Sequence, residues 1–430
     1  MPRSGQFPPR RRPIGRLTLV ASVLLLIASA RSKSSGAPPG PPPSGQPAAR
    51  SDAKRSQNRE PSAAALVQGV YESFGWIDAA RSFRIRTEYS FIPTEAKRRW
   101  EEKHPPLGEA PGTVDLRTFC LDSEWAWDKT RIHYSYENHY VGDPKSTYGC
   151  QKRIWDGSLA ISRSERSDHS QLSYAFDNKL GIFFDEQNVT TQLMLPWGPG
   201  GPHHFWWLST DVAAWREAAG LLPRDFELVG RETINSKPCY VVESWIGGYR
   251  LAVGVADGRL YRRTWLLAVE NKPGYDQKAI FQKVAGPTVK SYQGWVKWCE
   301  ALDPAGRSRA IHQLHVAEAE YVRSKRAAFH QFFDDYRQVS PGHWLPFRQF
   351  VIQYNTKAPE PFVESRIEQK VTTVSVDEPL PMKLFQIELQ DGVPVTTDWR
   401  YDPPIHYEYR KAQTEAERIA LRDLERRKRH

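Results

Sequence analysis

Residues 226–267 read FELVGRETINSKPCYVVESWIGGYRLAVGVADGRLYRRTWLL, and this stretch decides the fold. Its apolar runs are rich in Val, Tyr, Trp and Ile, the residue types that favour strands. The runs are separated by Asn235-Ser236-Lys237-Pro238, by Gly247-Gly248 and by Asp257-Gly258, and Asp-Gly between apolar runs is a strong hairpin signal. The stretch therefore predicts an antiparallel meander of three consecutive strands.

Further runs on both sides of the meander extend the same pattern. Residues 333–354, with a turn at Ser340-Pro341-Gly342, and residues 363–376 both alternate apolar and polar positions. Towards the N-terminus, a helix capped by Ser62 precedes a strand with Phe83 and Ile85 on one face. A hairpin at 119–136 then presents Trp125, Trp127 and Tyr134 to one side. The chain predicts one large curved sheet with insertions, a mainly β (α+β) fold.

Charge is unevenly distributed along the 430 residues, which carry a formal net charge of +10. Residues 1–60 hold eleven Lys or Arg against two Asp or Glu, so the remainder of the chain is close to neutral. A nucleic-acid-binding domain needs a basic footprint on its folded part. Nucleic acid is therefore not an expected partner.

The N-terminal segment has the form of a secretory signal. Basic residues between Arg3 and Arg16 precede an apolar core at residues 17–27 and a small-x-small site at Ala28-Ser29-Ala30. The apolar run is short for a bilayer crossing, so cleavage is favoured over an uncleaved anchor. Residues 1–30 are thus predicted to be a signal peptide that exports the chain from the cytoplasm, and the Pro/Gly/Ser-rich residues 31–60 a disordered linker.

Four cysteines, at positions 120, 150, 239 and 299, permit three pairings. An oxidising compartment allows a disulfide without requiring one. A bond between Cys120 and Cys150 would close a short loop and is the favoured pairing. The alternative is four buried thiols that pack as small apolar residues.

Two segments interrupt or follow the strands. Residues 271–331 are Lys/Gln/Ala-rich and carry an apolar stripe that includes Ile311, Leu314, Tyr321, Val322 and Phe329, which predicts a helical insertion. Residues 411–430 form a charged tail with a basic end, either solvated or in contact with anionic lipid.

Motifs of catalysis are absent from the sequence. There is no Gly-x-Ser-x-Gly elbow, phosphate-binding Gly-rich loop, His-Glu-x-x-His or Cys-x-x-Cys, so an enzyme is disfavoured and no cofactor is expected. His312, His315 and Glu318 could converge on one side of a helix and bind zinc, but a solvated helix face is the simpler interpretation.

The apolar faces suggest a cavity for an apolar guest. The central meander is apolar on both faces, so both faces must be covered from water. Helices can cover one face, and the other is covered if the sheet curls on itself. An aromatic loop at residues 195–208 would either rim that cavity or fold back onto the core. The candidate ligand-cavity residues are Phe83, Ile85, Trp125, Trp127, Tyr134, Trp206, Trp207, Tyr240 and Val242.

Four motifs carry a resemblance to a known family: Phe83-Arg-Ile-Arg, the block from Phe226-Glu-Leu-Val-Gly to Cys239-Tyr-Val-Val, Asp257-Gly-Arg-Leu-Tyr-Arg-Arg, and Asp335-Tyr-Arg-Gln-Val with Trp344-Leu-Pro-Phe. Residues 61–410 resemble the periplasmic outer-membrane lipoprotein carrier (LolA/LolB-like) superfamily, as a divergent member. The resemblance implies an open, incomplete antiparallel β-barrel with helices covering the concave side and a cavity for acyl chains. The chain departs from the simple carrier in its length, linker and insertion, and Arg84 and Arg86 do not match the carrier's functional arginine securely.

The favoured function is a non-catalytic periplasmic carrier that binds a lipid acyl chain or a lipidated protein, with a membrane surface, inner or outer, as a further contact. The first alternative is an envelope-stress or regulatory sensor that uses the same fold to bind a protein partner. A hydrolase with an unrecognised site ranks third. The sequence does not predict the ligand or the oligomeric state.

Overall fold

The structure is a computed structural model that describes residues 60–104, 118–128, 130–141, 143–165, 172–177, 220–356 and 358–429. The predicted signal segment, nearly all of the linker, and the candidate residues Trp206 and Trp207 lie outside these ranges. No helix among the described residues is long and apolar enough to span a membrane.

One sheet organises the molecule. Its fifteen strands run in the order β15-β14-β6-β5-β4-β3-β2-β1-β13-β12-β11-β10-β9-β8-β7, and all neighbours are antiparallel except β14 and β6. The strands are β1 (Phe83–Pro93), β2 (Phe119–Trp127), β3 (Ile132–Tyr140), β4 (Asp143–Trp155), β5 (Ala160–Glu165), β6 (Ser173–Asp177), β7 (Glu227–Ile234), β8 (Lys237–Ser244), β9 (Tyr249–Gly254), β10 (Leu260–Asn271), β11 (Val322–Ser340), β12 (His343–Asn355), β13 (Phe362–Val376), β14 (Pro394–Asp398) and β15 (Ile405–Glu408).

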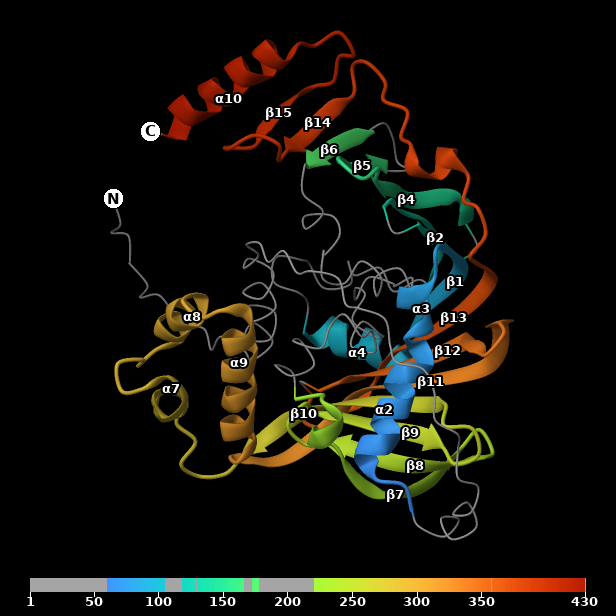
Figure 1. Cartoon of the computed structure of the whole chain (residues 1–430), viewed down its shortest axis with the longest axis vertical. Helices are drawn as coiled ribbons and strands as arrows, with labels where there is room; N and C mark the ends of the chain where they lie inside the picture. Colours follow the sequence, from blue (N-terminus) through green and yellow to red (C-terminus); the bar gives the residue numbers. More distant parts are fainter. Residues whose placement is uncertain are drawn as a thin grey trace, which may run out of the picture.

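The sheet is curved but not closed, since β15 and β7 are its two edges. Figure 1 shows the strands following a C-shaped path from β14 and β15 through β1 and β13 to β7 and β8. The predicted class, mainly β with an open sheet, is confirmed.

The predicted antiparallel meander is present, but it has four strands, β7, β8, β9 and β10, instead of three, because the Gly247-Gly248 break separates β8 from β9 as a turn. Asn235 and Ser236 connect β7 to β8 with φ values of 48° and 62°. Two central residues with positive φ form the type of tight turn that matches the twist of a hairpin. This turn fixes the register in which Ile234 faces Lys237.

The N-terminal strand lies in the middle of the sheet. β1 pairs on one side with β2, where Ile85 faces Trp125, and on the other side with β13, where Phe83 faces Val376. The sequence predicts β1 and β13 separately but does not predict that they are neighbours.

Two helices pack on one face of the sheet. Helix α2 (Ala63–Phe74) begins at Ser62, whose hydroxyl accepts a hydrogen bond from the backbone N–H of Ala65 at 3.2 Å, as the cap signal predicts. The short α3 (Trp76–Ala79) follows. Helix α4 (Glu95–Lys103) packs near the start of β13, where Lys97 pairs with Glu364.

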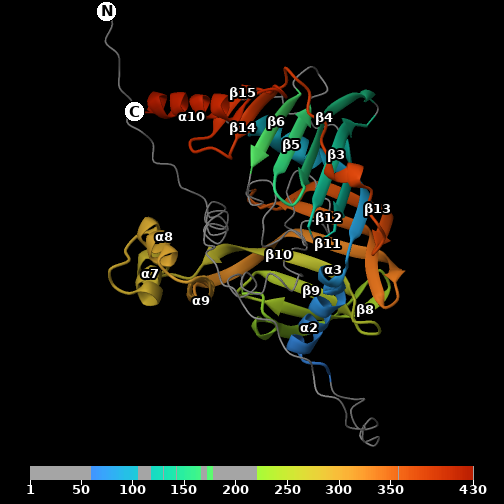
Figure 2. The ribbon, with the colours of Figure 1, turned by 45° about the horizontal axis from the view of Figure 1, so that its top comes forward.

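The helical insertion consists of α7 (Gln277–Ala285), α8 (Tyr292–Glu300) and α9 (Pro304–Ala319). These helices enclose a hydrophobic core of their own around Trp295 and Leu314, and Figure 2 shows them to one side of the sheet. The predicted helical stripe extends too far, because β11 begins at Val322 and includes Phe329. Pairing of β11 with β10 overrides the helical pattern there.

The C-terminal region adds strands that the sequence does not predict. The single-turn η5 (Met382–Phe385) leads to β14 and β15, and α10 (Glu415–Arg429) occupies most of the predicted tail. β14 is five residues long and starts with a proline, so its sequence gives little strand signal.

The predicted disulfide between Cys120 and Cys150 is not formed, since both are free thiols in the structure. Cys120 lies on β2 and Cys150 on β4, and β3 runs between them. Two strand spacings amount to about 9.6 Å, beyond the separation that a disulfide bridges. Cys239 and Cys299 are buried thiols.

Candidate ligand-binding face

The face that carries α2 is the concave face of the sheet. Side chains from β1, β2, β3, β8, β9, β10, β11, β12 and β13 join those of α2 and α3 in one hydrophobic cluster. Strands that far apart in the sheet order reach a common cluster only if the sheet curves towards the helices. Alternate residues of each strand therefore point to a shared interior.

One end of this face, which we call the covered half, contains most of the predicted cavity residues. Phe83, Ile85, Trp125, Trp127, Tyr134 and Val242 are all buried in the cluster that includes α2 and α3. The rings of Trp125 and Tyr134 are 4.1 Å apart between centroids. Side chains of α2, among them Tyr71 and Phe74, pack against these residues.

Tyr240 is placed differently from the other candidates. Its register opposite Val253 puts it on the concave face, but it is not a member of the cluster. The guanidinium of Arg231 lies 4.7 Å from the centre of its ring instead. Trp206 and Trp207 are outside the described residues, so their predicted role stays a prediction.

The other end of the concave face, the strand half, is defined by Tyr89, Leu121, Phe329, Val351 and Ile367. All five are buried, and every one belongs to a strand. Tyr89 faces Leu121 across β1 and β2, and Val351 faces Ile367 across β12 and β13. Phe91, Tyr136 and Trp265 are partly buried against them. Burial raises the pKa of the Tyr89 hydroxyl above its usual value.

A band of buried polar side chains runs through the same face. Arg263 faces Gln331 across β10 and β11, and Gln349 faces Gln369 across β12 and β13. The side-chain amide of Gln331 donates a hydrogen bond to the Gln349 side-chain oxygen at 2.9 Å. Each of these residues occupies an inward position of its strand, where an apolar residue is usual.

Arg263 is the charged member of this polar band and is fully buried. Its guanidinium lies 5.1 Å from the ring centre of Phe329 and 5.7 Å from that of Tyr249. Burial lowers the pKa of Arg263 to about 9, so the side chain still carries its charge at neutral pH. A cation between aromatic rings therefore borders the strand half.

These groups suit binding better than catalysis. Aromatic rings, carboxamides and one guanidinium match an amphiphile, which has an apolar chain and a polar head. No cluster of His, Cys, Asp or Glu in the described ranges could hold a metal ion. At the site considered for zinc, His312 instead lies 3.3 Å from Asp225, and the Tyr275 hydroxyl donates to Glu318 at 3.3 Å.

Sequence reasoning found the inward aromatic residues but missed Arg263 and the glutamines. A signal was present, because Gln369 alternates with Ile367 and Val371 and so takes an inward position of its strand. Arg84 and Arg86 are excluded from this face, since both pair with Glu124 on the opposite side of β1 and β2.

No protein-family model matches the chain, and no curated protein matches its sequence significantly. Among solved structures, a DUF1329 family protein from Desulfovibrio piger is similar, with 9% identity and a TM-score of 0.33 over 76% of this chain and 98% of that one. A putative outer membrane lipoprotein-sorting protein domain from Vibrio parahaemolyticus has 8% identity and a TM-score of 0.31 over 74% of this chain and 97% of that one.

Proposed function

We propose that this protein is exported to the periplasm and binds the acyl chain of a lipid or a lipidated protein on its concave face, without catalysing a reaction. The strand half carries this proposal. Buried aromatic and aliphatic side chains from neighbouring strands line one face of an open sheet there, next to a buried cation. An acyl chain would lie along the apolar strip, with its polar head towards Arg263.

The energetics of such a site favour a carrier. Each methylene kept out of water contributes about 0.8 kcal/mol, so an apolar strip offsets the free energy that an acyl chain loses when it leaves a bilayer. Dispersion contacts with several rings are individually weak, so the chain can leave again without breaking a strong directional bond. Export follows from the signal-like segment at residues 1–30.

Lipid content of the purified protein tests this proposal. The chain would be isolated from the periplasm without detergent and extracted with organic solvent, and the lipid measured per mole of protein. We expect close to one bound lipid. The Ile367→Ser variant should lose most of it, whereas Arg366→Ser, at the neighbouring exposed position of β13, should not. A lipid-free extract from correctly folded wild-type protein would refute the proposal.

The regulatory alternative has one structural observation in its favour. The helices α7, α8 and α9 have their own hydrophobic core, so they could present a surface to a protein partner independently of the sheet. Replacing residues 273–320 with a short Gly/Ser linker separates the two functions. Loss of a co-purifying protein with lipid retained would favour a sensor, and turnover in a panel of ester and glycoside substrates would favour a hydrolase.

A further inference from the structure

Helix α10 lies with its polar side towards the body of the protein. Arg418 and Arg422, one turn apart, keep only 18% and 28% of their side chains exposed. The Arg426 guanidinium donates a hydrogen bond to the backbone oxygen of Asp402 at 2.8 Å. A surface helix usually turns its apolar stripe inwards and its charges outwards, so this orientation is inverted.

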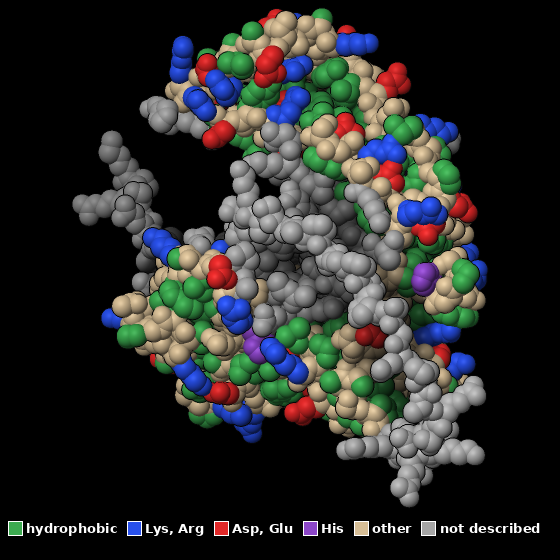
Figure 3. Space-filling model, viewed as in Figure 1, with side chains coloured by type: hydrophobic (Ala, Val, Ile, Leu, Met, Phe, Trp, Pro, Cys, Tyr) green, Lys and Arg blue, Asp and Glu red, His purple; other side chains and the backbone are tan. Residues whose placement is uncertain are grey.

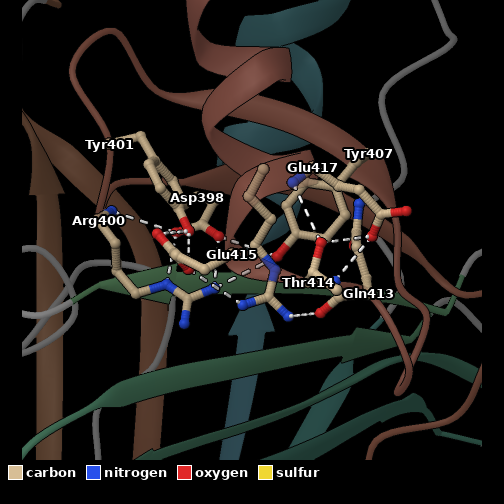
Figure 4. Close-up of polar contacts among 9 residues, drawn as sticks. Asp398, Arg400, Tyr401, Tyr407, Gln413, Thr414, Glu415 and Glu417 are labelled. Atoms are coloured by element: carbon tan, nitrogen blue, oxygen red, sulfur yellow. Dashed lines mark hydrogen bonds and ion pairs between the residues drawn. The ribbon is translucent and has the colours of Figure 1, made fainter.

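A polar network holds the helix in that orientation (Figure 4). Fully buried Asp398 accepts hydrogen bonds from Arg400 at 2.6 Å and from Tyr407 at 2.9 Å. The Tyr401 hydroxyl donates to Glu415, in the first turn of α10, at 2.8 Å.

The start of the helix is fixed by a reciprocal cap. The backbone N–H of Thr414 donates to Glu417 at 2.7 Å, and the backbone N–H of Glu417 donates to the Thr414 hydroxyl at 3.3 Å. This is the arrangement of a capping box, which stabilises a helix at its first turn. The inverted orientation is therefore built into the contacts of the C-terminal region.

The apolar stripe of α10 faces outwards except at its edge, where Leu421 is partly buried. Ala416, Ile419, Ala420 and Leu424 recur at three- and four-residue spacing and are all exposed, with Ile419 at 37% and Leu424 at 48%. Asp423 lies beside the stripe and is held by Arg422 at 2.8 Å. Apolar side chains of this size are normally the buried side of such a helix.

Positive charge surrounds this stripe. Arg426, Arg427 and Lys428 are exposed at the C-terminal end of the helix, and residues 410–430 hold eight Lys or Arg against four Asp or Glu. Basic side chains flank α10 in the space-filling view (Figure 3). A helix with an exposed apolar stripe and a basic end has the features of helices that lie in the headgroup region of a bilayer.

We infer that α10 docks the protein on an anionic membrane surface, with Ile419 and Leu424 inserted among the headgroups and Arg427 and Lys428 on the lipid phosphates, while Arg426 stays bonded to Asp402. The charge of this region selects a lipid surface over a second copy of the chain, whose α10 would repel it. The inference does not depend on the concave face holding a lipid.

Co-sedimentation with vesicles tests the inference. The full-length mature protein would be mixed with vesicles of phosphatidylglycerol and phosphatidylcholine in equal amounts, and with vesicles of phosphatidylcholine alone. We expect binding to the anionic vesicles, decreasing as salt is raised. Exchange of Arg427 and Lys428 for Gln should weaken the binding constant about thirty-fold, and Ile419→Ser with Leu424→Ser about ten-fold.

A matched control comes from α4, where Arg98 and Arg99 are also exposed. Exchanging these two for Gln removes the same charge and should leave vesicle binding unchanged. Bound-lipid content, measured as above, should be unchanged in both sets of α10 variants. That readout separates a failure of membrane docking from a failure of the proposed lipid site.

Three results would overturn the inference. The first is equal binding to both kinds of vesicle, and the second is wild-type binding by the α10 variants. The third is the absence of vesicle binding together with a dimer that the Ile419→Ser, Leu424→Ser variant dissociates in analytical ultracentrifugation. The salt series on the wild-type chain needs no variant, so the inference stays testable if a substitution harms folding.

Discussion

The two halves of the concave face are built on the same strands but contact different parts of the molecule. On β1, Phe83 and Ile85 contact the cluster that includes α2. Among the described residues, the cluster of Tyr89 and Phe91 consists of strand residues, and α4 reaches it through Lys97, whose ammonium lies 5.6 Å from the centre of the Phe91 ring. Both halves are apolar and aromatic, so composition does not distinguish them. The difference shows that the position of a covering helix, rather than the strand pattern, separates packed core from candidate binding surface.

The largest effect should come from the covered half. Phe83→Ala removes a fully buried ring beneath α2 and should lower the free energy of unfolding by about 3–5 kcal/mol, measured by urea denaturation. Val229→Ala at an exposed position of β7 should change it by less than about 0.5 kcal/mol. A small loss for Phe83→Ala would mean that this half is not a packed core.

Stability should also depend on pH through a buried histidine on the other face of the sheet. It lies behind the covered half, where η5 contacts β3. Burial and, to a smaller extent, the nearby charge of Lys152 lower the pKa of His133 on β3 to about 4, from 6.5 in the unfolded chain. The unfolded state therefore binds more protons between these values. The free energy of unfolding should have its full value above pH 6.5 and should fall by on the order of 3 kcal/mol as the pH drops to 4.

The His133→Leu variant isolates this contribution. Its free energy of unfolding should depend less on pH between 6.5 and 4 than that of the wild type, whereas His104→Leu, at an exposed position after α4, should follow the wild type. Parallel curves for wild type and His133→Leu would contradict the assignment.

A smaller effect on stability but a larger one on binding is expected in the strand half. Trp265 is only partly buried and contacts Phe329 at 5.8 Å between ring centres. Trp265→Ala should weaken binding of a fatty acid with a fluorescent group in its chain by about 2 kcal/mol, measured by titration. If Trp265→Ala instead unfolds the protein and leaves the affinity of the folded fraction intact, the two halves are not functionally different.

The smallest effect concerns selectivity. Arg263→Met keeps an apolar stem of similar length and removes the charge, so it should weaken binding of the fluorescent fatty acid by about 1 kcal/mol more than that of the matching fatty alcohol. Arg337→Met, at an exposed position of β11, provides the control. Equal losses for acid and alcohol would show that Arg263 packs against the ligand without recognising its head.

Much of the sheet could be predicted because its strands carry local signals. Alternation identifies β1, β2, β3 and β13, and turn residues such as Asn235-Ser236 identify the meander. Pairings between segments far apart in the chain leave no such signal. The contact of β1 with β13 and the parallel contact of β14 with β6 are therefore visible only in the structure.

The candidate site was predictable to a similar degree. The inward rings follow from alternation, so Phe83, Trp125 and Tyr134 could be grouped correctly. Their division into two halves depends on where α2 packs, which is a tertiary property. Arg263 was hidden because register shifts in β10 place it on the same face as Leu260, three positions earlier, and no local pattern predicts such shifts.

The pairing of Phe83 with Val376 has a consequence for how the protein forms. The central strand cannot complete its hydrogen bonds until the last third of the chain has been synthesised, so the topology has a high contact order and should fold slowly. During that interval β1 offers an unpaired edge to other chains. A chain that ends before Phe362 should therefore aggregate or require a chaperone, even though it retains the entire meander.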